Sequence, residues 1–225
     1  MTSNFISVVF LVIFTTLNGI APAISQPLYT FIAQTSAEDF NRRGMEKIKS
    51  RDFLGAIEYF NQAIALKPNY IAAYFNRGFA RIELQDFTGA IEDFTHVIKI
   101  NPGFVKAYYE RGFALIELGK YPEAIEDFTQ AINLDPNFGD AYNERGYAYA
   151  KQKNYQAAIA DYNRAIELIP ENPIVYLNRG NTRIALGDKP GAIADFQKAS
   201  DLFTTQGNMA LSQQIQQLIK KLQQE

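Results

Sequence analysis

Residues 105–138 read VKAYYERGFALIELGKYPEAIEDFTQAINLDPNF, and the pattern of this stretch recurs along the chain with a period of 34 residues. One glycine stands at the same phase of every copy: Gly44, Gly78, Gly112, Gly146 and Gly180. Periods of roughly 20–50 residues are typical of stacked repeat proteins, in which each unit buries its apolar face against its neighbours. Five units cover residues 37–206, divided as 37–70, 71–104, 105–138, 139–172 and 173–206.

Four other residue types keep the same period. They are an alanine (Ala56, Ala90, Ala124, Ala158 and Ala192), a first aromatic (Phe40, Tyr74, Tyr108, Tyr142 and Tyr176), a second aromatic (Phe60, Phe94, Phe128, Tyr162 and Phe196) and a proline (Pro68, Pro102, Pro136 and Pro170). A single unit of this kind would be weak evidence, whereas units in phase with one another indicate a repeat architecture.

Each unit has the pattern of two helices. In the second unit, apolar residues within 74–84 follow one helical stripe, and those within 90–98 follow another after a break at 85–86. Polar residues suited to a helix start precede the second stripe in four units: Asp52, Asp86, Asn154 and Asp188. The proline that closes a unit cannot continue a helix. The sequence therefore predicts an all-α fold.

The glycines indicate where the two helices of a unit touch. A glycine inside a helix costs roughly 1 kcal/mol relative to alanine, so its recurrence at one phase implies a close contact there. We expect the alanine of the second helix, 12 residues after the glycine, to fill the facing site. We expect the two aromatics to wedge between neighbouring helices and bury most of the apolar area.

This pattern resembles the tetratricopeptide repeat, over about three quarters of the chain. The resemblance implies a right-handed α-solenoid of five helix-turn-helix units, concave on the side of the first helices. The last unit and the tail are also similar to the repeat proteins of cyanobacteria. The tail, residues 207–225, predicts a C-terminal capping helix. Its expected apolar face comprises Leu211, Ile215, Leu218, Ile219 and Leu222.

Two positions depart from the family pattern and suggest ion pairs. The residue before each glycine is an arginine: Arg43, Arg77, Arg111, Arg145 and Arg179. The residue before the second aromatic is an aspartate in four units, Asp93, Asp127, Asp161 and Asp195, and Tyr59 in the first. Because arginine can pair bidentately with a carboxylate, we expect these residues to fix the register between helices. The alternative is that the arginines capture an anion in the groove.

In the family, the concave groove is lined by the first-helix positions three and two residues before the glycine and one residue after it. Here those positions hold Asn41, Arg42 and Met45; Phe75, Asn76 and Phe79; Tyr109, Glu110 and Phe113; Asn143, Glu144 and Tyr147; and Leu177, Asn178 and Asn181. All of them except Arg42 and Leu177 are the predicted partner-binding residues. Members that clamp a C-terminal carboxylate need a polar and basic set of residues, which Met45 and Glu110 interrupt, so we do not expect that clamp.

An aromatic strip remains in the predicted groove. It consists of Phe75, Phe79, Tyr109, Phe113 and Tyr147, edged by Glu110, Glu144 and Asp140. Aromatic anchors with a polar rim are typical of protein interfaces. The alternative is that these rings pack between neighbouring first helices and present only their edges.

Composition argues against several classes of function. The chain has no Cys, which excludes disulfides, thiolate metal sites and a catalytic thiol. Its 22 basic residues are spread along a chain of net charge −2, so nucleic acid is not an expected partner. Phosphate-loop, nucleophile-elbow and EF-hand motifs are absent from the sequence. His96 shares its phase with Gln62, Gln130, Arg164 and Lys198, so we expect it on a solvated face. We therefore expect no enzyme, cofactor, metal site or small-molecule substrate.

The first 25 residues differ from the rest. Residues 5–17 are almost wholly apolar, and Ala21-Pro-Ala23 and Ser25 follow as small residues near a cleavage point. This predicts a signal peptide over 1–25, a linker over 26–36 and an exported protein, periplasmic, lumenal or secreted. No Lys or Arg precedes the apolar run, which leaves open a membrane anchor formed by residues 5–24 or a buried apolar arm.

These observations favour an exported scaffold that binds a protein or peptide partner in its concave groove. The partner would present an apolar segment with basic flanks, and contact with a membrane would require an uncleaved N-terminal segment. Two alternatives are a purely structural, self-associating array and a chaperone-like accessory factor for an enzyme or membrane complex. Fold alone does not distinguish them, because function resides in the side chains of the groove.

Overall fold

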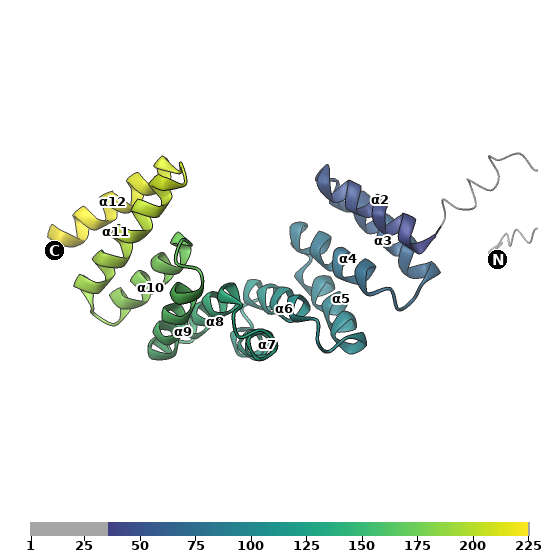
Figure 1. The fold of residues 1–225 in the computed structure, drawn as a ribbon, viewed down its shortest axis with the longest axis horizontal. Coiled ribbons are helices and arrows are strands. Elements are labelled where there is room, and N and C mark those ends of the chain that lie inside the picture. Colours follow the sequence, from purple (N-terminus) through teal and green to yellow (C-terminus); the bar gives the residue numbers. More distant parts are fainter. Residues whose placement is uncertain (1–35, 225) are drawn as a thin grey trace, which may run out of the picture. The chain divides into compact units, whose positions relative to one another are not determined.

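The computed structural model describes residues 36–224 of the chain, and within them it contains helices joined by short turns (Figure 1). The first helices of the units are α2 (Ala37–Lys49), α4 (Ile71–Glu83), α6 (Val105–Glu117), α8 (Gly139–Lys151) and α10 (Pro173–Ala185). The second helices are α3 (Phe53–Leu66), α5 (Phe87–Ile100), α7 (Tyr121–Leu134), α9 (Tyr155–Leu168) and α11 (Lys189–Thr205), and α12 (Met209–Gln224) follows. The all-α prediction is confirmed. The predicted signal peptide and nearly all of the predicted linker lie outside the described residues.

The helix starts follow from the polar residues that precede them. The side chains of Asp52, Asp86 and Asp188 each accept a hydrogen bond from the backbone N–H three residues on, at 3.0, 3.0 and 2.9 Å. Asn154 does the same at 3.4 Å. These bonds satisfy N–H groups that the first turn of a helix leaves without a partner. In the third unit α7 begins after Lys120 and has Pro122 in its first turn, where a missing N–H is tolerated.

The predicted close contact between the helices of a unit is confirmed, but its partner was predicted wrongly. A Cβ atom on Gly112 would lie 2.9 Å from Cε1 of Phe128, the second aromatic of the same unit. The other four glycines also face the second aromatic ring of their own unit. The ring crosses the helix interface and fills the site that the alanine was expected to fill. Ala124 instead shares a core cluster with Phe128 and with Ala148 of the next unit, where its small side chain lets the next first helix approach.

The two aromatics of a unit differ in burial. The second aromatics are at most 1% exposed in every unit. Among the first aromatics only Tyr176 is buried, and the others are partly exposed. In four units the arginine beside the glycine lies over the ring of the first aromatic, for example with Arg77 Cζ 5.3 Å from the centre of Tyr74. The first aromatic therefore supports the arginine as well as the core.

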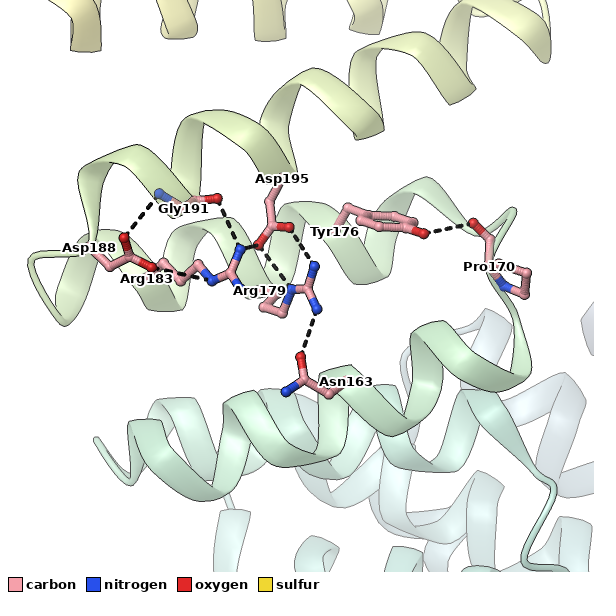
Figure 2. A network of polar contacts seen from close by, with 8 residues as sticks. All are labelled: Asn163, Pro170, Tyr176, Arg179, Arg183, Asp188, Gly191 and Asp195. Atoms are coloured by element: carbon pink, nitrogen blue, oxygen red, sulfur yellow. Dashed lines mark hydrogen bonds and ion pairs between the residues drawn. The ribbon is translucent and has the colours of Figure 1, made fainter.

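In the second to fifth units the arginine and the aspartate of the repeat form a bidentate ion pair, as expected. In the fifth unit Arg179 donates from Nε and Nη2 to the two carboxylate oxygens of Asp195, at 3.0 and 2.6 Å (Figure 2). The same two bonds join Arg77 to Asp93, Arg111 to Asp127 and Arg145 to Asp161. In the first unit Tyr59 stands in place of the aspartate, and Arg43 forms no ion pair within residues 36–224.

The remaining arginine nitrogen joins consecutive units. Nη1 of Arg179 donates to Asn163 on the second helix of the preceding unit, at 2.6 Å (Figure 2). Asn61, Thr95 and Thr129 accept the equivalent bonds in the units before it. Each of these four arginines thus holds three helices together, and its partner aspartate is buried. This geometry supports the register role of the arginines and leaves the anion-capture alternative without support.

First helices lie next to one another along the stack. Each of α2, α4, α6 and α8 contacts the first helix of the following unit, and each second helix contacts the next first helix. Among residues 36–224 no second helix contacts another second helix. The side chains that first helices direct away from their own second helices therefore form one continuous side of the stack. Within the same residues, no helix combines the length and apolar character needed to span a bilayer.

The C-terminal helix packs on α11 in a phase that the sequence only partly predicted. Ile215 and Ile219 are buried and Leu222 packs against them, but Leu211 and Leu218 are 37% and 39% exposed. Ser212 turns inward instead and lies 2.8 Å from the hydroxyl of Ser200 on α11. These two small side chains allow α11 and α12 to approach closely, and this contact sets which face of α12 is buried.

The Gly112–Phe128 contact generates a stability prediction. A leucine at Gly112 would meet the Phe128 ring and force α6 and α7 apart, which should destabilise the protein by roughly 1–3 kcal/mol. Thermal melting followed by circular dichroism measures this loss. Gly103→Leu is the matched control, because Gly103 is exposed and a Cβ there would meet only the Asn101 side chain, at 3.4 Å. Equal melting temperatures for the two variants would contradict the assigned contact.

Candidate partner-binding surface

The predicted partner-binding residues all lie on the first helices. We call this set the first-helix surface. Three of its members, Met45, Phe79 and Asn181, are exposed, and Asn143 is buried. The others are partly buried: Asn41, Phe75, Asn76, Tyr109, Glu110, Phe113, Glu144, Tyr147 and Asn178. The surface is therefore a mixture of side chains that are free to contact a partner and side chains that are already engaged.

An apolar hollow lies between α2 and α4. It is lined by Met45, Ile48, Phe75, Asn76 and Phe79 and has a volume of about 310 Å³. Met45 is 37% exposed and Phe79 is 36% exposed, although both are large apolar side chains. Ile48 was not predicted, although it follows Met45 by three residues and so lies beside it on the helix surface. The hollow can accept an apolar side chain from outside.

Two rings of the predicted aromatic strip are used in packing. The Phe75 ring lies 5.6 Å from that of Phe94 and 5.1 Å from that of Phe104. Tyr109 repeats the arrangement one unit later, 5.8 Å from Phe128 and 4.9 Å from Phe138. These rings meet the second helix of their own unit and the loop that follows it. Phe75 still forms part of the hollow, whereas Phe79 presents its ring more openly.

Asparagine side chains connect neighbouring first helices. The Asn76 side-chain amide donates to Oδ1 of Asn41 at 3.0 Å, between α4 and α2. Asn178 donates to Asn143 at 3.1 Å in the same way, between α10 and α8. Asn143 in turn donates to Glu144 at 2.9 Å. These bonds order the surface and use part of the hydrogen-bonding capacity that a peptide backbone would otherwise meet.

Carboxylates occupy the middle of the first-helix surface. Burial raises the pKa of Glu110, and the nearby Lys106 opposes that rise. Burial also raises the pKa of Glu144, the bond from Asn143 lowers it, and the negative charges of Asp140 and Glu117 raise it further. Burial, together with Glu144, Asp140 and Glu110, raises the pKa of Tyr109 above its usual value. This stretch of the surface is therefore acidic, with Lys106 acting on Glu110 and the acidic Asp140 and Glu117 acting on Glu144.

A second hollow lies between α8 and α10. It has a volume of about 240 Å³ and is lined by Tyr147, Ala150, Lys151, Tyr155, Tyr162, Asn178, Asn181, Thr182 and Ala185. Lys151 lies over the Tyr147 ring, with Nζ 4.9 Å from the ring centre. This hollow lies between the first helices of two consecutive units, as the first does, but more of its lining is polar. The sequence had identified Tyr147, Asn178 and Asn181 but not Lys151 or Thr182.

His96 differs from the prediction of a solvated position. Its ring stacks on that of Tyr74, with centres 3.9 Å apart and planes inclined at 29°, and the residue is partly buried. Its Nε2 atom is buried and has no hydrogen-bond partner in the described part of the chain. The expectation failed because an imidazole ring can stack on a neighbouring aromatic, whereas Gln62, Gln130 and Lys198 at the same phase remain exposed. Residues 36–224 contain no cluster of side chains suited to a metal ion.

Comparison with known proteins gives a family match. The family model described as the tetratricopeptide repeat matches residues 41–103 and 109–173, which is more than half of the chain. No curated protein sequence matches the chain.

Solved structures share the fold. MamA from Desulfovibrio magneticus RS-1, residues 41 to the end, superposes with a TM-score of 0.71 at 22% identity, covering 76% of this chain and 96% of that one. YrrB, described as a TPR protein with an unusual peptide-binding site, gives 0.67 at 17% identity, covering 85% and 97%. PilW, described as a widely conserved type IV pilus biogenesis factor, gives 0.67 at 19% identity, covering 82% and 92%. At sequence identities this low, these superpositions show a common fold and nothing further.

The environment of Glu144 generates a pH prediction. Its pKa is raised in the folded protein, so between the unfolded and folded values the folded state binds more protons, and stability falls as the pH rises. Glu144→Gln removes the charge and keeps an oxygen that can accept the bond from Asn143. We expect this variant to melt higher than the parent at pH 7, by a few degrees at most, since about 1 kcal/mol shifts Tm roughly 2–4 °C at this size.

The difference should disappear below the ordinary glutamate value of 4.5, where the carboxyl group is protonated in both states. Melting curves across pH measure it, with Glu92→Gln at an exposed position of α5 as the control. A Glu144→Gln variant that melts below the parent at pH 7 would contradict the assigned environment.

Proposed function

Because this chain belongs to the tetratricopeptide repeat family, we propose that it is a binding scaffold that holds a protein or peptide partner on the first-helix surface. The observation that carries the proposal is the apolar hollow between α2 and α4. Met45 and Phe79 remain more than a third exposed at its rim, whereas Phe113 and Tyr147 at the same position of the next two units are partly buried. An exposed apolar hollow beside polar side chains is typical of a recognition site.

The chemistry of the surface favours an apolar segment with basic flanks. The hollow suits a large apolar side chain, and Glu110, Asp140 and Glu144 form no ion pairs within residues 36–224. Lys or Arg in the flanking part of the same segment would neutralise part of their charge and speed the encounter. YrrB, which has the same fold, is described as having a peptide-binding site, and this is consistent with the proposal.

We also propose that the protein is exported. The support is the apolar run of residues 5–17 followed by Ala21-Pro-Ala23 and Ser25, all outside the described residues. Mass measurement of the protein purified from its native host should give an N-terminus near Ile24 or Gln26. Membrane-bound protein that still begins at Met1 would support an anchor in place of a cleaved signal.

Binding itself is tested at the hollow. Peptides selected from a random display library on the purified protein serve as the partner, and calorimetry measures their affinity. Phe79→Ala should weaken binding by about 2 kcal/mol, the loss typical of a central anchor residue. Leu54→Ala is the matched control, because Leu54 is 69% exposed on α3, a second helix, and should leave affinity unchanged.

Circular dichroism of both variants checks that they are folded. Full affinity in a folded Phe79→Ala variant would place the binding site elsewhere. The exposed Leu211 and Leu218 on α12 would then be the next surface to examine.

A further inference from the structure

The hollow and the unpaired carboxylates of the first-helix surface lie on different helices. The hollow is formed by α2 and α4, whereas Glu144 and Asp140 are carried by α8. Helix α6 lies between them, because α4 contacts α6 and α6 contacts α8. A partner that used both features would have to cross α6 between them.

The two features differ in what they can bind. Phe75 forms one wall of the hollow and is fixed by the rings of Phe94 and Phe104, so this wall is already ordered before a partner arrives. An ordered apolar site loses little conformational freedom when a side chain enters it. The hollow therefore suits a single large apolar side chain rather than a charged one.

Glu144 is available to a cation, because neither it nor Asp140, four residues before it on α8, forms an ion pair within residues 36–224. Glu110, one unit earlier, has Lys106 nearby to offset part of its charge. The charged neighbours of Glu144 are instead the acidic Asp140 and Glu117. A Lys or Arg from a partner would relieve this repulsion, and an ion pair in a partly buried site is screened less by salt than one on an open surface.

The spacing between the two features can be estimated from helix packing. Packed helices lie about 8–10 Å apart, and the hollow reaches from α4 halfway to α2, so the two to two and a half steps to α8 span roughly 16–25 Å. An extended chain advances about 3.3 Å per residue, and the span then corresponds to about five to eight residues. A helical segment of the same length in residues would advance only about half as far.

We infer that the first-helix surface recognises an extended segment in a fixed register, with a large apolar residue in the hollow between α2 and α4 and a Lys or Arg about five to eight residues away at Glu144. This inference rests on the proposed function and adds to it the class and spacing of the residues recognised. The partner is then a polypeptide segment with one apolar anchor and one basic anchor, and neither anchor alone is sufficient for full affinity.

Synthetic peptides of Ser, Thr and Gly that contain one Phe and one Arg test the register. The two residues are separated by two, five or ten residues, and each spacing is made in both chain orders. Fluorescence anisotropy at low salt measures Kd for the purified protein. With the five-residue spacing, one of the two orders should bind at least about tenfold more tightly than either other spacing, because both anchors can then be engaged at once.

Two variants assign the preference to its sites. Glu144→Gln should abolish the advantage of the five-residue spacing, and Glu92→Gln on α5 should preserve it. Phe79→Ala should weaken binding of the matched peptide by about thirtyfold, which corresponds to the loss of a strong anchor. Circular dichroism confirms that each variant is folded.

Affinity that does not depend on spacing, or a spacing preference that survives Glu144→Gln, would overturn the inference. If library-selected peptides still require Phe79 in that case, the proposed function stands and only the register is wrong. If selected peptides also bind without regard to Phe79, the proposed function fails together with the register.

Discussion

The structure depends on one contact repeated in every unit: the second aromatic ring of the second helix rests on the glycine of the first. Any side chain at Gly112 would meet the Phe128 ring, and the same holds for the equivalent pairs. The ion pair stands one residue earlier on both helices, with Arg111 before Gly112 and Asp127 before Phe128. Ring and ion pair therefore fix the same register, one by close packing and the other by directed hydrogen bonds.

This contact also determines which residues are available for binding. The faces that carry the glycine, the arginine and the rings are committed to holding helices together. The residues two positions before the glycine lie outside this packing, and their identity differs between units. They are Arg42, Asn76, Glu110, Glu144 and Asn178. The resulting surface changes along the stack from apolar between α2 and α4 to acidic on α8. In this fold, the recurring residues that hold the helices together and the variable residues of the first-helix surface are separate parts of each unit.

Much of the fold could be predicted from the sequence because the same residue types recur at the same positions in every unit. The helix pairs, the caps at Asp52, Asp86, Asn154 and Asp188, and the arginine–aspartate pairs all follow from residue type and period. The partner of the glycine was assigned wrongly, because period alone does not indicate which of two second-helix residues reaches across an interface. The hydrogen bonds between units could also have been predicted. Their acceptors are small polar residues spaced 34 apart, each directly after the second aromatic: Asn61, Thr95, Thr129 and Asn163.

The surface was harder to predict than the fold. Position identified the residues that lie on first helices, but it could not separate the engaged rings of Phe75 and Tyr109 from the exposed Phe79. It also could not show that Asn76 is bonded to Asn41 or that Ser212 replaces Leu211 on the buried face of α12. These outcomes depend on side-chain contacts that differ from one repeat to the next, so no repeating sequence pattern indicates them.

The central claim is that a partner binds on the side of the first helices, and photo-crosslinking tests it most directly. A photoreactive phenylalanine analogue is placed at Phe79 or, in a separate variant, at Leu54, both of which are exposed. Each variant is irradiated with a peptide selected on the unmodified protein, and mass spectrometry locates the adducts. The account predicts a peptide adduct from position 79 and none from position 54. An adduct from position 54 with none from position 79 would contradict it.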